Sequence, residues 1–214
     1  KKYTKYQHRE PKLKTYNVRC CKSVDDNILE VIGKDVAGNP QTRIENKEYF
    51  THKQFRGQGV HIINTITRIG TQAFQLAGLK TLSFEVNSKC REISPSAFQA
   101  TPLESVYLPK SLIYIRTSAF KRCYSLETVY IPSDSILKQI GDEAFKDCTS
   151  LKEIYIPDSV YYIGKEAFYN TNLEKVYIHL DLFNKIYKSR ANYFKSNSKI
   201  VAHVRGPFSR AVIL

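Results

Sequence analysis

Residues able to perform covalent or metal chemistry are few in this chain, and their spacing argues against an active site. Five histidines are scattered without metal-ligand spacing: His8, His52, His61, His179 and His203. Ser118-Ala-Phe-Lys121 matches the S-x-x-K pattern of penicillin-binding proteins, but the companion motifs are absent. No P-loop, no G-x-G-x-x-G and no C-x-x-C pair occurs. The sequence therefore predicts a protein that is not an enzyme and has no catalytic residue, cofactor or metal site.

The tyrosines offer recognition chemistry instead, because one recurs between two apolar residues in strand-like phrases such as Val106-Tyr107-Leu108 and Ile154-Tyr155-Ile156. Side chains alternate across a strand, so each tyrosine should face solvent while its neighbours face the core. Aromatic residues are enriched in recognition hot spots. Alternatively, stacked tyrosines only shield a β ladder. The predicted partner-binding face contains two columns of residues: His61, Ser83, Tyr107, Tyr130, Tyr155 and Tyr177, and beside them Thr81, Ser105, Thr128, Glu153 and Lys175.

These tyrosines must be positioned by a sequence repeat. The repeated phrase consists of Ile-Gly-x-x-Ala-Phe, then a leucine, then an apolar-Tyr-apolar strand. Its phenylalanines are separated by 24, 22, 25 and 23 residues: Phe74, Phe98, Phe120, Phe145 and Phe168. A period in this range indicates stacked coils that share one core, and stacked strands form a parallel sheet. The stretch around each phenylalanine predicts about one helical turn. Cys123 and Cys148 occupy the same slot in successive repeats and are predicted to be buried packing residues.

The segments Ile140 to Leu151 and Leu151 to Ile178 resemble the BspA-type leucine-rich repeat family, and the resemblance is strong over residues 57–178. Ser94 and Arg116 depart from it, since the family prefers glycine in their slot. The resemblance implies a β-dominated repeat solenoid, a right-handed superhelix with a parallel sheet and short convex helical turns. It also implies a non-enzymatic module that binds proteins, host components or other macromolecules. Members occur on bacterial surfaces and in parasitic protists.

Charge divides the chain into three parts: a basic non-repeat segment or cap over residues 1–43, the solenoid over 44–178 and a basic cap over 179–214. Residues 1–22 have a net charge of +7 and residues 179–214 one of +6, whereas residues 23–178 contain 18 basic and 18 acidic residues. The basicity of the chain therefore belongs to its two ends.

The basic ends support an alternative function, in which they dock on nucleic acid, a ribonucleoprotein or an anionic membrane surface. Aromatic residues are interleaved with the cations there, as single-strand binding would require. Solvated tails without a partner are the simpler interpretation. The candidate contacts are Lys12, Lys14, Arg19, Lys188 and Arg190.

The location of the protein is left open by the sequence. No run of 18 apolar residues occurs, so no transmembrane segment is predicted. Free cysteines and the lack of N-glycosylation acceptors favour an intracellular location. The chain contains no methionine, which leaves a processed cell-surface protein as the other hypothesis. The adjacent Cys20 and Cys21 are expected to be reduced, because a vicinal disulfide is strained.

Overall fold

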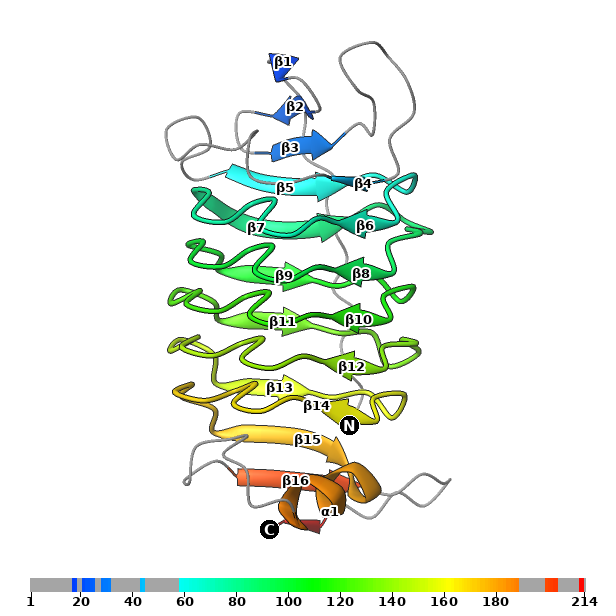
Figure 1. The fold of residues 1–214 in the computed structure, drawn as a ribbon, viewed down its shortest axis with the longest axis vertical. Coiled ribbons are helices and arrows are strands. Elements are labelled where there is room, and N and C mark those ends of the chain that lie inside the picture. The colour runs from blue at the N-terminus through cyan, green and yellow to red at the C-terminus, as the bar shows by residue number, and fades with distance from the viewer. Residues whose placement is uncertain are drawn as a thin grey trace.

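The computed structural model describes residues 58–188 without a gap, together with the separate strand segments 17–18, 21–25, 28–31, 43–44, 199–203 and 212–213. Side chains are described from residue 59 to residue 186. Within these residues the chain winds into stacked coils whose strands form parallel sheets on two sides of the molecule (Figure 1). The structure is therefore a parallel β-solenoid, and the predicted fold class is confirmed.

The first sheet carries the tyrosine phrases of the repeat. Its parallel strands are β3 (Ile28–Val31), β5 (Gln58–Ile62), β7 (Leu79–Phe84), β9 (Ser105–Tyr107) and β11 (Thr128–Tyr130). Two antiparallel strands extend it beyond β3, namely β2 (Cys21–Asp25) and β1 (Asn17–Val18). Tyr107 pairs with Tyr130 in the ladder between β9 and β11. Equivalent residues of successive repeats therefore lie side by side.

A second sheet of two-residue strands lies on another side of each coil. In chain order its strands are β4 (Arg43–Ile44), β6 (Arg68–Ile69), β8 (Glu92–Ile93), β10 (Tyr114–Ile115), β12 (Gln139–Ile140) and β14 (Tyr162–Ile163). The isoleucines of β6 to β14 are buried, whereas the residue before each of them is half-buried or exposed. This alternation gives the second sheet its own solvent-facing surface.

The strand ladder on the first side of the solenoid is interrupted once. Beyond β11 a separate four-stranded sheet begins with β13 (Glu153–Tyr155) and continues through β15 (Lys175–His179), β16 (Lys199–His203) and β17 (Val212–Ile213). The interruption falls in the longest repeat. Seven residue steps lead from Pro132 to Gln139, whereas five lead from Pro109 to Tyr114. The interruption therefore coincides with two additional residues in the segment that follows Pro132.

The sheets also continue past both predicted domain boundaries. Strand β3 lies within the predicted N-terminal cap but pairs in parallel with β5. Strand β16 lies within the predicted C-terminal cap and pairs in parallel with β15. Strand pairing therefore does not stop at either predicted boundary. The domain boundaries at 43/44 and 178/179 themselves stay predictions.

The third side of each coil, which contains the repeated phenylalanine, is a series of β-turns. Within one turn the N–H of Gln99 donates to the carbonyl of Ser96 at 3.1 Å, and between turns the N–H of Phe98 donates to the carbonyl of Ala119 at 2.8 Å. The i to i+3 bonds resemble the predicted helical turn. Left-handed residues two positions before and after each phenylalanine prevent it from continuing as a helix: Gln72, Leu76, Ser96, Ala100, Ser118, Arg122, Glu143, Asp147, Glu166 and Asn170.

The core is built around a stack of phenylalanine rings, and every member of the stack is fully buried: Phe74, Phe98, Phe120, Phe145 and Phe168. Successive ring centroids are 5.0 to 5.4 Å apart and the rings are nearly parallel. Cys123 and Cys148 are also fully buried, which confirms their predicted packing role. Burial raises the pKa of the Cys148 thiol well above its usual range.

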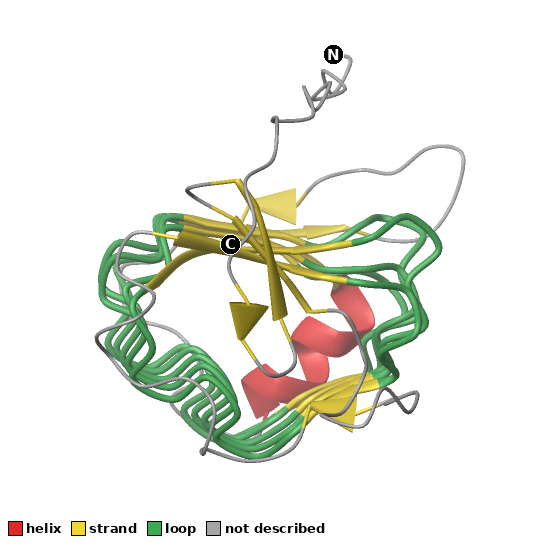
Figure 2. Ribbon diagram, turned by 90° about the horizontal axis from the view of Figure 1, so that it is seen from above, coloured by secondary structure: helices red, strands yellow, loops and turns green. Residues whose placement is uncertain are grey.

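Helix α1 (Leu180–Lys188) covers the C-terminal end of this core. In Figures 1 and 2 it lies across the end of the coils, next to β15 and β16. Its buried side chains are Leu182, Phe183 and Ile186. Covering the last coil with an apolar helix face keeps the open end of the solenoid out of water.

Candidate functional site

The tyrosine sheet face consists of the two predicted columns of residues on the first side of the solenoid. Tyr130 is its most prominent ring, with 54% of its surface exposed. Tyr107, Tyr155 and Tyr177 are half-buried. The valines and isoleucines between them are buried, for example Val106 at 0% exposure. The predicted outward orientation of the tyrosines is therefore present in the structure.

The upstream part of this face is ordered by direct side-chain contacts. The Nδ1 of His61 and the hydroxyl of Ser83 are 2.9 Å apart, across the ladder from β5 to β7. The rings of Tyr107 and Tyr130 are 6.4 Å apart and tilted by 44°. Such contacts limit the rotamers of these side chains, so less conformational entropy is lost when a partner binds.

The second column adds polar groups beside the rings. Ser105 is half-buried, and three further members are exposed: Thr128, Glu153 and Lys175. At the margin of the face Lys80 forms an ion pair with Glu104 at 2.8 Å. The exposed charges of Glu153 and Lys175 form no ion pair within residues 59–186. The face therefore combines rigid aromatic area with polar groups that can bond to a partner.

The interruption between β11 and β13 divides the tyrosine sheet face into two parts. One part contains Tyr107 and Tyr130, and the other contains Tyr155 and Tyr177. The sequence predicts that the four tyrosines form one continuous column. The structure places all four on one side but joins them by strand pairing only within each part.

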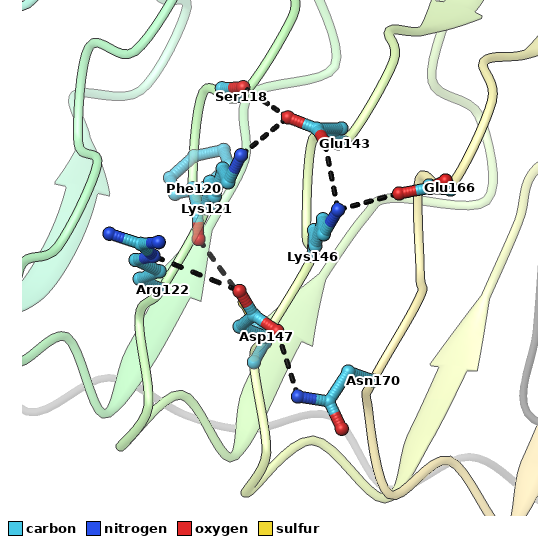
Figure 3. Close-up of polar contacts among 10 residues, drawn as sticks. Ser118, Phe120, Lys121, Arg122, Glu143, Lys146, Asp147, Glu166 and Asn170 are labelled. Atoms are coloured by element: carbon cyan, nitrogen blue, oxygen red, sulfur yellow. Dashed lines mark hydrogen bonds and ion pairs between the residues drawn. The ribbon is translucent and has the colours of Figure 1, made fainter.

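The S-x-x-K match lies on the turn side of the solenoid, in an ion-pair network (Figure 3). Glu143 accepts hydrogen bonds from Lys121 at 2.6 Å and from Ser118 at 3.3 Å. Lys146 donates to Glu143 at 2.9 Å and to Glu166 at 2.6 Å. Lys121 and Ser118 both bond to Glu143, and no hydrogen bond between the two is seen among the described residues, so the contact that a serine nucleophile needs with its base is not formed. The network joins three successive coils and has the geometry of a structural clamp.

The electrostatics of this network favour the charged states of Glu143 and Lys146. Hydrogen bonds from Lys121 and then Lys146 lower the pKa of Glu143 to about 2. Hydrogen bonds to Glu166 and then Glu143 raise the pKa of Lys146. Nearby, Asp147 accepts a hydrogen bond from Asn170 at 2.8 Å. These residues lie on the turn side of the solenoid and not on the tyrosine sheet face.

The predicted basic contacts lie outside the described side chains. Lys12, Lys14, Arg19 and Arg190 are outside the described residues, and Lys188 is described only as the last residue of α1. Among the described residues no group of three or more His, Cys, Asp or Glu side chains could hold a metal ion. No helix in the described part of the chain is long and apolar enough to cross a membrane.

The repeats match a known family of leucine-rich repeats. The family described as BspA type leucine rich repeat region matches residues 42–173 in six copies. The chain belongs to this family. Leucine-rich repeat proteins of this kind are protein-interaction modules, typically without enzymatic activity. A search of curated proteins finds no match.

Two solved structures of bacterial proteins are similar to this chain. The pneumococcal vaccine antigen PcpA is 25% identical, with a TM-score of 0.61, over 78% of this chain and 50% of that one. A leucine rich cell surface protein from Faecalibacterium prausnitzii A2-165 is 22% identical, with a TM-score of 0.41, over 78% of this chain and 55% of that one. This chain thus spans about half the length of these two proteins.

Proposed function

We propose that this leucine-rich repeat module binds a macromolecular partner, most simply a protein, through its tyrosine sheet face. The observation that carries the proposal is the set of outward tyrosines on two parallel strand ladders, with Tyr130 54% exposed. Tyrosine supplies a large, stiff contact area together with a hydroxyl that can bond to the partner. The solenoid keeps these rings at fixed spacing, so the face is organised before the partner arrives.

The similarity to the pneumococcal antigen supports this proposal at the level of architecture. Because the chain covers only 50% of the antigen, the activity of the whole antigen is not transferred to it. The proposal therefore rests on the exposed rings and polar groups of the tyrosine sheet face.

The test is to isolate the partner with the purified chain from an extract of its natural source, identify it by mass spectrometry and measure its Kd against variants. Tyr130→Ser combined with Tyr155→Ser should weaken binding by a factor of about 10 to 100, as expected for hot-spot rings. Tyr124→Ser is the matched control, because Tyr124 is 55% exposed but lies outside the tyrosine sheet face. It should leave the Kd unchanged.

The basic ends provide the competing explanation, and the same assay separates the two. If charge reversal at Lys12, Lys14 and Arg19 abolishes binding while the double tyrosine variant binds normally, the tyrosine sheet face is not the site. A Kd that rises steeply with salt would point to the same conclusion, because contacts to a polyanion release counterions.

A further inference from the structure

The second sheet presents a face that the proposed function does not use. Figure 2 shows the two sheets on different sides of the coil. We define the basic sheet face as the outward residues of the strands β6, β8, β10, β12 and β14 together with the residues within two positions of these strands. Its cations are Arg68, Arg91, Arg116, Lys138 and Lys165, and its anions are Glu92 and Asp142. Residues 23–178 are neutral as a whole, so this excess of positive charge is local.

The positive charge of this face is only partly neutralised. Glu92 pairs with Arg68 at 3.0 Å and with Arg116 at 2.9 Å, so one carboxylate serves two guanidinium groups. Burial opposes the ionisation of Glu92, but hydrogen bonds from Arg116 and Ser94 outweigh it and lower its pKa. The remaining cations are exposed and form no ion pair within the described residues: Arg91, Lys138 and Lys165.

Two exposed rings lie among these cations. Tyr161 and Tyr162 are 49% and 43% exposed. The hydroxyl of Tyr161 accepts a hydrogen bond from Nε2 of Gln139 at 3.1 Å, and the hydroxyl of Tyr162 donates to Asp142 at 3.4 Å. These bonds hold the polar edge of each ring against the sheet. The aromatic surface is consequently positioned in advance and still accessible to a ligand.

The basic sheet face also adjoins the basic C-terminal end. Lys185 of α1 donates from Nζ to the backbone carbonyl of Tyr161 at 3.4 Å. Lys185 belongs to residues 179–214, which have a net charge of +6. Within the described residues, the positive surface therefore extends from the repeats to Lys185 of α1.

Cations that flank exposed, restrained rings fit a polyanion that also has flat π faces. Phosphates pair with lysine and arginine, and unpaired bases stack on tyrosine. A duplex hides the faces of its bases, and an acidic peptide would use the cations but not the rings. We propose that the basic sheet face binds single-stranded nucleic acid, with bases stacked on Tyr161 and Tyr162 and phosphates paired with Lys138 and Lys165.

The experiment measures binding of a fluorescein-labelled 20-nucleotide oligo-dT to the full chain by fluorescence anisotropy at several salt concentrations. Lys138→Glu with Lys165→Glu should raise the Kd at least tenfold and make the salt slope shallower by about 1.4, because each lost phosphate contact contributes about 0.7. The matched control is Lys80→Glu with Lys152→Glu, which makes the same charge change at two exposed lysines, one in β7 and one next to β13. It should change the Kd less than about twofold at 150 mM salt, because exposed charges are screened over about 8 Å there.

The rings are tested separately from the charges. Tyr161→Ser with Tyr162→Ser should weaken oligo-dT binding about tenfold, whereas Tyr169→Ser, at a ring 45% exposed on the turn side, should have no effect. Circular dichroism verifies that each variant is folded. Heparin, which has sulfates but no bases, should bind more weakly and should not respond to loss of the two rings.

Four results would overturn the proposal. The first is the absence of oligo-dT binding by the unmodified chain. The second is an equal loss of binding in the two lysine pairs, which would show a response to net charge alone. The third is heparin or poly-glutamate binding at least as tight as oligo-dT, which would assign the face to another acidic polymer. The last is loss of binding only when Lys12, Lys14 and Arg19 are changed to glutamine, which would place the site in the N-terminal segment.

Discussion

Replacing Glu143 by glutamine tests how much the turn-side network stabilises the stacking of coils. The carboxylate of Glu143 accepts from Lys121 at 2.6 Å and from Lys146 at 2.9 Å, and its pKa falls from the usual 4.5 to about 2. At about 1.36 kcal/mol per pH unit, this difference corresponds to at most about 3 kcal/mol of folding free energy. Solvent screens the pairs, since 29% of the Glu143 side chain is exposed. We therefore expect Glu143→Gln to cost about 1–2 kcal/mol at pH 7.

The pH dependence gives this prediction a defined sign. A carboxylate whose pKa is lower in the folded state contributes its full stabilisation above pH 4.5 and loses it as the pH falls toward 2. Urea unfolding followed by circular dichroism gives the free energy of unfolding of the original chain and of Glu143→Gln. The difference between them should shrink to a small fraction of its neutral value by pH 2.5.

A matched ion pair supplies the control. Glu104 pairs with Lys80 at 2.8 Å, but both side chains are about half exposed, at 49% and 48%. Glu104→Gln should therefore cost less than about 0.5 kcal/mol. If both variants lose the same stability, or if the cost of Glu143→Gln is unchanged at pH 2.5, the electrostatic explanation of the network is wrong.

Three further predictions concern the packing of the coils, and urea unfolding measures each of them. Phe120→Ala or Phe145→Ala should cost about 3–5 kcal/mol as truncations of the stacked core, and near-neutral values would contradict the repeat alignment. Gly164→Ala should cost about 3 kcal/mol, because its Cβ would clash with the backbone nitrogen of Asp142 in the previous coil. A cost below about 1 kcal/mol would show that the coils can separate there. Ala100→Gly should be neutral or stabilising by up to about 1 kcal/mol, because φ is 56° at this residue, whereas Ala119→Gly, at a buried alanine without a positive φ, should be destabilising. Equal losses at the two alanines would refute the strain argument.

The repeat was sufficient to predict the fold because each of its signals is local and recurs. Phe120 and Phe145 mark the same slot, and stacked coils place equivalent slots together. The outward orientation of Tyr130 followed from the same alternation, and it is observed. The binding role of that face stays a prediction, because exposure alone does not identify a partner.

Other features depend on information that a single repeat does not contain. The interruption between β11 and β13 coincides with two additional residues after Pro132, and whether two coils pair depends on how they meet. The pairing of Lys121 with Glu143 joins residues 22 positions apart and requires the register of the coils. The left-handed conformation of Ala100 goes against the local preference of alanine and is imposed by its neighbours. Helix α1 was missed, although Leu182, Phe183 and Ile186 have helical spacing.

On the turn side of the solenoid, the backbone N–H groups of the repeated phenylalanines point in one direction. The N–H groups of Phe98, Phe120 and Phe145 all point to carbonyls of the following coil, at 2.8, 2.8 and 2.7 Å. Each of these peptide dipoles is therefore aligned in one direction along the solenoid axis, as in a helix, whereas dipoles alternate along a strand. The positive pole lies at the C-terminal coil. Glu143 and Glu166 belong to the last two turns that the structure describes, on the side toward that pole. The peptide dipoles of the turn side therefore have one direction, whereas N–H groups beside the sheets, such as those of Arg116 and Gly141, point to the preceding coil.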